Sequence, residues 1–349
     1  MLKIVRTPRN VQPFFDSLRE AGCLTAAQFQ HLMWFVLGLI AAFVRSDLSI
    51  PEAIAKALSL YLVMAIGFKG GAEMAAGDLN WSVGGALLAG VVLSALLPVL
   101  GFGLLMLTTR VGRIDAAAIA AHYGSISIVT FIAASDAARF LDTPGEGFMV
   151  AVAAAMEAPA IVTALILAGS AARASNGGEG HSESRLSVLK EIAANGSIVL
   201  LIGAFFIGWM TGPRGMEAVS PFFNDIFRGV LCLFLLDMGL VAGRGLLRNW
   251  RVLKPGVIGF GLYMPVIGAL AGMGTGLLVG LEAGSLGLLM TLAASASYIA
   301  VPAALRLALP EARPAISLTL ALGITFPFNL VAGIPLYFWL ARLVTGTGG

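Results

Sequence analysis

Apolar residues occur in long runs along this chain, and polar or charged residues gather between the runs. A transmembrane helix needs about 20 consecutive, predominantly apolar residues. About ten runs approach or exceed that length, and the expected spans are 29–45, 53–69, 82–107, 114–134, 147–170, 192–211, 221–243, 256–280, 284–307 and 314–343. The pattern therefore predicts an all-α polytopic membrane protein with about ten transmembrane helices.

The composition agrees with a chain that is solvated by lipid. Hydrophobic residues make up 58% of the sequence, charged residues only 12%, and the mean hydropathy is +0.91. A soluble domain carries roughly 25% charged residues. The net charge is +3, and the basic residues gather at span ends without forming a basic stripe. Nucleic acid is therefore not an expected partner, and the bilayer is.

A polar, glycine-rich stretch at 171–185 divides the spans into two groups of about five. An odd number of spans makes the second group start from the opposite side of the membrane. Two related groups then form an inverted repeat, which is typical of secondary transporters. The expected organisation is a polar N-terminal segment, a first five-helix unit, a polar loop, a second five-helix unit and a tail, at 1–28, 29–170, 171–191, 192–343 and 344–349.

Weak similarity between the two groups supports the repeat. Three short segments of the first group have a counterpart in the corresponding span of the second group, in the same order. The pairs are Ile66–Gly71 with Met238–Gly243, Tyr123–Ser127 with Ala294–Ser297, and Glu157–Pro159 with Thr325–Pro327.

The distribution of basic residues predicts the orientation. Short loops on the cytoplasmic side are enriched in Lys and Arg. The larger set of basic residues near span ends falls on one side and comprises Arg45, Arg110, Arg113, Arg173, Arg185, Lys190, Arg244, Arg248, Arg251, Lys254, Arg306 and Arg313. We therefore expect a bacterial inner membrane protein with both termini outside and the 171–191 loop in the cytoplasm, although the basic N-terminal segment favours the reverse.

The fourth and ninth spans carry small and hydroxyl residues at mid-membrane depth, around Ser125–Thr130 and Ser295–Pro302. Gly124 and Pro302 favour an interruption of each helix. An interrupted helix leaves backbone groups that lipid cannot satisfy, and such half-helices bind anions and cations in transporters. The sequence predicts discontinuous fourth and ninth helices; close helix packing is the alternative use of such small residues.

Glu157 lies near the middle of the fifth span, two residues before Pro159. A carboxylate at that depth costs several kcal/mol unless it is paired, protonated or bound to a cation. We expect it to serve as a cation ligand, as a titrating proton site, or as a partner that orients a neighbouring ligand. A structural hydrogen bond within the bundle is the alternative.

Other ionisable residues favour simpler interpretations. Lys69 and Glu73 are four residues apart at a span end and predict an exposed ion pair on one helix. His122 is expected to be a packed neutral histidine. For Asp237 a structural role and a functional role are equally favoured. Three scattered histidines and two cysteines predict neither a metal centre nor a disulfide.

Several segments together resemble the sodium-dependent bicarbonate transporters, typified by the cyanobacterial high-affinity symporter, in the version found in proteobacteria. The resemblance covers about 29–343 and is carried by Ser46–Ile54, Ile66–Gly71, Met156–Ala164, Ala293–Pro302 and Leu305–Arg306. It implies two inverted five-helix units, a core and a gate domain, a homotrimer and a PII-like regulatory partner.

The resemblance also implies a bicarbonate and sodium site where the broken helices meet. The residues that match substrate-binding positions are Gly124, Ser125, Ser127, Thr130, Ser295, Ser297 and Tyr298. Thr130, Ser295 and Glu157 are the candidates for the sodium ion, either as ligands or beside them. Tyr298 stands where the cyanobacterial pattern has an Asp, and Ile128-Val129 stand where that pattern has Gly-Ser.

These observations predict a secondary active transporter that imports a small anion, most simply bicarbonate with sodium, by alternating access. Sodium is expected as the coupling ion, and no cofactor or catalytic residue is expected. A proton- or sodium-coupled carrier of another small organic anion is the alternative. A channel would need a continuous polar lining, and a membrane-embedded enzyme would need a nucleophile–base pair, for which His122 beside Ser125 is the candidate.

Overall fold

The computed structural model describes most of the chain as helices. The described residues are 26–76, 81–157, 159, 160, 162, 163, 166, 167, 196–250, 253–298, 301, 305 and 311–346. Within these residues there is no strand. The predicted loop at 171–191 and the first 25 residues of the predicted N-terminal segment lie outside the described residues.

The described residues form the following helices, in chain order. They are α2 (Ala26–Phe43), α3 (Glu52–Ala76), α4 (Trp81–Thr108), α5 (Arg113–Gly124), α6 (Ile128–Phe140), α7 (Met149–Ala155), α10 (Gly196–Ser220), η1 (Pro221–Asp225), α11 (Phe227–Asn249), α12 (Pro255–Val279), α13 (Ala283–Ala294), α15 (Pro314–Leu320), η3 (Ala321–Thr325), α16 (Phe326–Phe328), η4 (Asn329–Gly333) and α17 (Ile334–Thr345). The elements named η are single turns of π-helix.

Seven helical stretches within the described residues are long and apolar enough to cross a membrane. They correspond to the second, third, fourth, sixth, seventh, eighth and tenth predicted spans. The first and ninth spans contain shorter apolar helices, and the fifth is described only in part. The prediction of an all-helical, multi-pass membrane protein is therefore confirmed.

Local sequence explains where several helices begin and end. Pro255 and Pro314 occupy first-turn positions of α12 and α15, where the missing N–H has no helical partner to lose. Gly280, with φ of 80°, ends α12 in the left-handed conformation that glycine tolerates best. In α10 the helix is kinked at Gly212, with φ of 59°, directly before Pro213.

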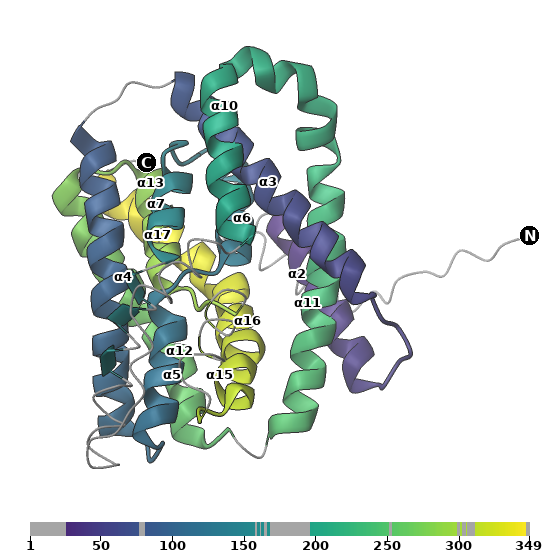
Figure 1. Cartoon of the computed structure of the whole chain (residues 1–349), viewed down its shortest axis with the longest axis vertical. Coiled ribbons are helices and arrows are strands. Elements are labelled where there is room, and N and C mark those ends of the chain that lie inside the picture. The colour runs from purple at the N-terminus through teal and green to yellow at the C-terminus, as the bar shows by residue number, and fades with distance from the viewer. Residues whose placement is uncertain are drawn as a thin grey trace, which may run out of the picture.

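The helices form two groups. In the first, which we call the four-helix panel, α2 packs along α11 and α3 packs along α10, on the right of Figure 1. The remaining helices form the central bundle, in which α4 packs on α5 and α12, and α13 packs on α12 and α17. The central bundle contains both spans that the sequence predicts to be broken.

Glycines allow the paired helices of the panel to approach closely. A Cβ added to Gly71 of α3 would lie 1.9 Å from the Phe205 carbonyl oxygen of α10. A Cβ added to Gly239 of α11 would lie 2.1 Å from the Phe35 carbonyl oxygen of α2. Such backbone-to-backbone packing is how membrane helices associate without a hydrophobic driving force.

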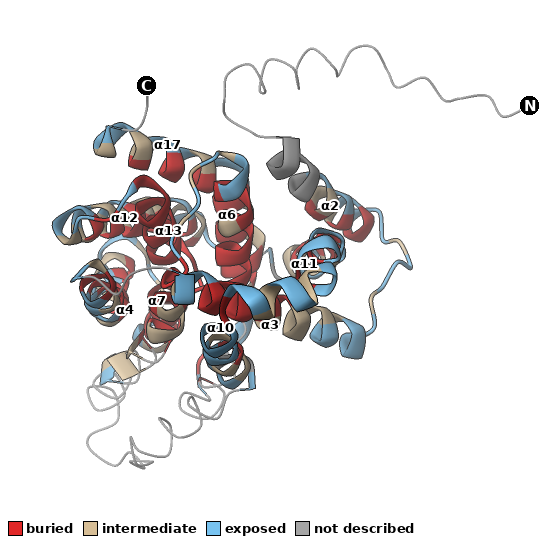
Figure 2. Cartoon of the chain, turned by 90° about the horizontal axis from the view of Figure 1, so that it is seen from above, coloured by how far each residue is buried: buried red, intermediate tan, exposed pale blue. Residues whose placement is uncertain are grey.

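Burial separates a lipid-facing surface from the interior (Figure 2). Large apolar side chains such as Leu107, Met210 and Leu278 are at least 84% exposed on outer helices. By contrast, α6 is buried along nearly its whole length, and it lies among other helices in Figure 2. The second half of the fourth span is therefore solvated by protein and not by lipid.

Candidate functional site

The fourth span is interrupted at Ser125–Ser127, where the sequence predicts a break. α5 ends at Gly124 and α6 begins at Ile128. Ser125 has φ −88° and ψ 148°, and Ser127 has φ −98° and ψ 108°, so both are extended. The Ser127 hydroxyl accepts a hydrogen bond of 3.2 Å from the Thr130 N–H and caps the N-terminus of α6.

The ninth span is interrupted at a matching place. α13 ends at Ala294, and Ser295 has extended angles, φ −83° and ψ 160°. The carbonyl of Ala294 accepts a 2.9 Å hydrogen bond from the Asn329 side-chain amide. The Tyr337 hydroxyl in turn donates to the Asn329 side-chain oxygen at 3.0 Å. Asn329 of the tenth span, itself held by Tyr337, thus satisfies a carbonyl that the helix end leaves free.

The two interruptions are hydrogen-bonded to each other. The Ser297 N–H donates to the His122 carbonyl oxygen at 2.7 Å. The Ser127 N–H donates to the Ser295 hydroxyl at 2.9 Å. All four residues are at least 97% buried. Because lipid offers no partner to backbone groups, the breaks are stable here through one another.

Glu157 reaches the first break from the fifth span. The Ser125 hydroxyl donates to a Glu157 carboxylate oxygen at 2.5 Å, and both side chains are buried. Among the described ionisable side chains, Glu157 is the one with a hydrogen bond to the side chain of a break residue. Its predicted place next to the candidate cation site therefore agrees with the geometry, while the bound ion itself stays a prediction.

Ser94 of α4 shapes the backbone around Glu157. Its hydroxyl donates to the Met156 carbonyl and accepts from the Ala160 N–H at 3.1 Å. In a regular helix those two backbone groups would bond to each other. The hydroxyl is inserted into the helical ladder, which is a known cause of helix bending, and this opening lies next to Glu157.

Tyr298 lies at the second break, where it faces Ser127. Its hydroxyl is buried and has no hydrogen-bond partner of normal geometry among the described residues. Its ring packs edge-on against Phe326, with centroids 5.9 Å apart. A buried phenolic hydroxyl beside two serine-rich breaks, with no partner of normal geometry among the described residues, is a donor that a bound anion can use.

His122 does not act as a base toward Ser125 in this structure. Its Nδ1 donates to the Ala118 carbonyl at 3.0 Å, and Nε2 is buried without a partner among the described residues. Ser125 donates instead to Glu157. The nucleophile–base pair that a membrane-embedded enzyme would need is therefore not formed.

The structure brings six of the seven predicted substrate residues together around the paired breaks. They are Ser125, Ser127, Thr130, Ser295, Ser297 and Tyr298. Gly124 has a different surrounding, because a Cβ there would lie 2.2 Å from Pro98 and 2.9 Å from the Ser94 carbonyl. Its small size serves packing against α4, and a direct role in binding stays a prediction for all seven.

The N-terminus of α6 gives the site a partial positive charge. A helix N-terminus carries roughly half a positive charge, and α6 begins at the break itself. Hydroxyls lie beside it, and one carboxyl group, that of Glu157, is bonded to Ser125. The arrangement can bind a small oxyanion and a cation next to each other without a basic side chain in the break.

Sequence reasoning missed Ser94, Asn329 and the pair formed by Tyr123 and Thr325. The Tyr123 hydroxyl lies 2.5 Å from the Thr325 hydroxyl, which donates to the Gly261 carbonyl at 2.8 Å. Asn329 was detectable as an amide inside an apolar run. Ser94 precedes Pro98 by four residues, but nothing in the sequence identifies its partners.

One prediction about charged residues is wrong. Lys69 and Glu73 do not form an exposed ion pair on α3. Lys69 is only 4% exposed, and Glu73 is bonded to Arg139 of α6 at 2.7 Å. The reason is tertiary: α3 is packed against other helices at Lys69, and the partly exposed Glu73 side chain meets a cation of α6 instead.

The chain matches a known protein family. A family model described as the Na+-dependent bicarbonate transporter superfamily matches residues 31–342, which is well over half of the chain. No curated protein matches the chain. The matched region includes both breaks, Glu157 and all helices of the panel and the central bundle except the ends of α2 and α17.

Proposed function

The chain belongs to the Na+-dependent bicarbonate transporter superfamily, a family of transporters and not of enzymes, and on that premise we propose that it imports bicarbonate together with sodium by alternating access. The observation that carries the proposal is the pair of hydrogen bonds that joins the two breaks, Ser297 N–H to His122 C=O and Ser127 N–H to Ser295 Oγ. A bundle built only for packing would have continuous helices at this depth.

The chemistry of the breaks suits both ions. Bicarbonate offers acceptor oxygens and one donor, and serine and threonine hydroxyls both donate and accept. The N-terminus of α6 favours an anion, while carbonyls, hydroxyls and a carboxylate are ligands for a sodium ion. We propose that Ser127, Ser297 and Tyr298 contact bicarbonate and that Glu157 acts on sodium, directly or through Ser125.

We propose that the two halves form an inverted repeat. The panel supports this relation, because the first span pairs with the seventh while the second pairs with the sixth. In a five-plus-five repeat the first span corresponds to the sixth and the second to the seventh. The pair formed by spans one and seven therefore corresponds to the pair formed by spans six and two. The glycines at these contacts, Gly67 and Gly71 of α3 and Gly239 and Gly243 of α11, belong to segments that are similar in sequence and do the same packing work.

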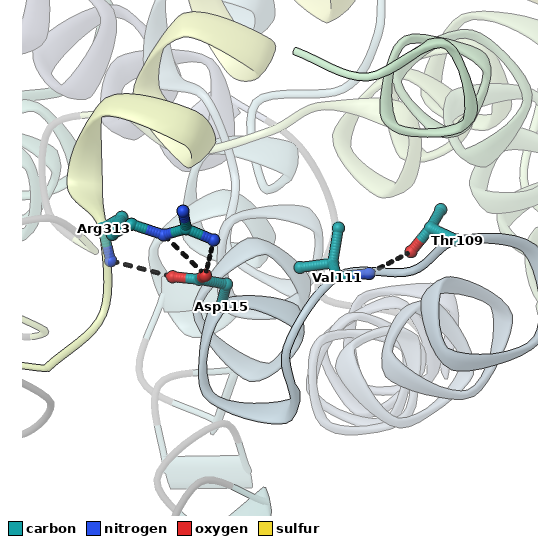
Figure 3. A network of polar contacts seen from close by, with 4 residues as sticks. All are labelled: Thr109, Val111, Asp115 and Arg313. Carbon is teal, nitrogen blue, oxygen red and sulfur yellow. Dashed lines mark hydrogen bonds and ion pairs between the residues drawn. The ribbon is translucent and has the colours of Figure 1, made fainter. Parts of the chain in front are cut away.

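A pair of polar contacts supports the same relation. At the start of the fourth span, Asp115 accepts from the Arg313 backbone N–H and from Nε, both at 2.9 Å, and from Nη2 at 2.5 Å (Figure 3). At the start of the ninth span, Ser285 accepts from the Glu146 backbone N–H and donates to its carboxylate, both at 3.0 Å. The first turn of each broken span is thus tied to the residues just before the span that follows the other broken span: the fourth span to the start of the tenth, and the ninth to the start of the fifth.

The division into panel and central bundle supplies the moving parts that alternating access requires. The central bundle holds both breaks, and the panel makes its own close helix pairs. We propose that the bundle moves against the panel and so exposes the breaks to each side in turn. A homotrimer would hold the panels still, and a PII-like regulator would act from the cytoplasmic side; both stay proposals by resemblance.

The proposed orientation follows the basic residues. The connections from α2 to α3, from α4 to α5 and from α11 to α12 lie toward the lower end of Figure 1, and each has basic residues in or beside it. By the positive-inside rule this end is cytoplasmic. The C-terminal end of α17 then lies outside, in a bacterial inner membrane.

Uptake of radiolabelled bicarbonate into proteoliposomes tests the function. We expect accumulation with an inward sodium gradient and none when choline replaces sodium outside. Flux that a proton gradient drives without sodium would favour coupling to protons in place of sodium. The phenol of Tyr298, at a position where the family pattern has a carboxylate, would be consistent with that alternative. Competition by a small organic anion, with bicarbonate itself not taken up, would contradict bicarbonate as the substrate.

A further inference from the structure

A polar pocket lies between the panel and the central bundle, apart from the break residues. It is lined by Lys69 and Glu73 of α3, by Ser135 and Arg139 of α6, and by Glu146 before α7. These parts of α3, α6 and α7 lie toward the upper end of Figure 1, opposite the basic loops. In the proposed orientation the pocket therefore opens to the outside, where a substrate to be imported arrives.

The carboxylates at the pocket already have partners. Glu73 is bonded to Arg139 at 2.7 Å, and Glu146 accepts from Ser285 at 3.0 Å. Asp136, which follows the pocket residue Ser135 in α6, forms an ion pair with Arg228 at 3.5 Å. A cation entering the pocket would have to displace one of these contacts, so the pocket is not prepared for a cation.

Two donors at the pocket have no ion-pair or hydrogen-bond partner among the residues that the structure describes. Lys69 is 4% exposed, and its ammonium lies over the Phe227 ring, 4.2 Å from the centroid. No carboxylate of the described residues lies within ion-pair distance of it, and the Ser135 hydroxyl has no hydrogen bond to a described residue. A buried ammonium is costly unless an anion or water completes its hydrogen bonds, and among the described residues the Phe227 ring is the one contact of the Lys69 ammonium within reach.

We propose that this pocket is a staging site for a small oxyanion, in which the Lys69 ammonium and the Ser135 hydroxyl hold the incoming anion before it reaches the breaks. Phe131, which also lines the pocket, follows Thr130 directly in the chain. A positive charge at the mouth of a path raises the local concentration of an anion. As a step in bicarbonate import, the inference rests on the proposed function.

Transport kinetics test this step. Lys69→Gln should raise the KM for bicarbonate roughly tenfold, as expected for loss of electrostatic steering, with little change in kcat. Lys69→Arg should keep most of the wild-type KM. Lys56→Gln removes an exposed lysine on the same helix and should leave KM unchanged, and equal KM values for Lys69→Gln and Lys56→Gln would overturn the proposal.

A second experiment needs no transport. In a background with Cys23→Ala and Cys232→Ala, Ser135→Cys provides a thiol that reports on the pocket. We expect an anionic methanethiosulfonate reagent to react roughly tenfold more slowly when Lys69→Gln is added, while a neutral reagent of similar size reacts as before. Equal slowing of both reagents, or of neither, would refute the anion site.

The two experiments separate the possible failures. If the wild type takes up no bicarbonate but the charge-selective thiol reaction is seen, the proposal of bicarbonate transport is refuted and the proposal of an anion site at Lys69 is supported. If bicarbonate uptake is normal and neither KM nor the thiol reaction depends on Lys69, the function stands and the staging site is wrong.

Discussion

Ser127 and Ser295 each form hydrogen bonds at the break with both the backbone N–H and the side-chain hydroxyl. The Ser127 N–H is bonded to the Ser295 hydroxyl, and the Ser127 hydroxyl caps the Thr130 N–H. A buried backbone donor left without a partner costs about 1–3 kcal/mol. In the proposed cycle a bound anion replaces such internal partners, so binding exchanges hydrogen bonds and does not create buried, unsatisfied groups.

Glu157→Gln tests the carboxylate at the same scale. Glutamine keeps an oxygen that accepts from Ser125, but it has no charge for a cation. Loss of one charge-assisted interaction, about 1.5 kcal/mol or more, predicts a rise of roughly tenfold or more in the sodium concentration for half-maximal uptake. The bicarbonate KM at saturating sodium should change much less.

Two observations would argue against this role of Glu157. Unchanged sodium dependence in Glu157→Gln would leave the carboxyl as a structural hydrogen-bond acceptor. A large loss of thermal stability, measured in detergent, would also point to a structural role. As a matched control, Glu217→Gln changes a partly exposed carboxyl on α10 and should alter neither property.

The sequence predicts the break residues better than it predicts their partners. Small and hydroxyl residues in two apolar runs are a local signal, and they mark Ser125–Ser127 and Ser295–Ser297 correctly. Ser94 and Asn329 act across long separations in the chain, on Met156 and Ala294. Such contacts depend on how the helices pack, which no local pattern contains.

At the scale of elements, the panel depends on glycines that let backbones touch. Gly239→Ala would place a methyl group 2.1 Å from the Phe35 carbonyl oxygen, so α2 and α11 must separate. We expect a loss of about 1–3 kcal/mol in stability, as for other overpacked interfaces, seen as a lower melting temperature in detergent.

Gly229→Ala is the matched control on the same helix. An added Cβ there meets nothing within 4 Å, and alanine is favoured over glycine in a helix by about 0.5–1 kcal/mol. Its melting temperature should stay level or rise. Equal effects of the two substitutions would show that the contact between α2 and α11 is not as close as described.

Helix boundaries show where element prediction fails. The second span was expected to end at Lys69, where charged residues begin, yet α3 continues to Ala76. Lys69 is buried inside the protein, and Glu73, whose side chain is 47% exposed, is bonded to Arg139 of α6. The tenth span contains the π-helical turns η3 and η4 just before Pro327 and Pro335, which the pattern of apolar residues does not reveal.

At the scale of the whole molecule, the orientation of the chain decides which way the transporter imports. In the background with Cys23→Ala and Cys232→Ala, a membrane-impermeant maleimide applied to intact cells should label Gly346→Cys, beyond α17. It should label Lys254→Cys, before α12, only after the membrane is opened. The reverse labelling would invert the proposed topology and place the Lys69 pocket on the cytoplasmic side.

The central claim is that the meeting point of the two breaks binds the transported anion. The initial rate of sodium-driven bicarbonate uptake tests it most directly, compared between Ser127→Ala and the exposed control Ser49→Ala at equal amounts of folded protein. We predict that Ser49→Ala keeps the wild-type rate. Ser127→Ala should lose roughly tenfold or more, because a hydrogen bond to a charged ligand contributes about 1.5–3 kcal/mol. Wild-type uptake by Ser127→Ala at low bicarbonate would contradict the account.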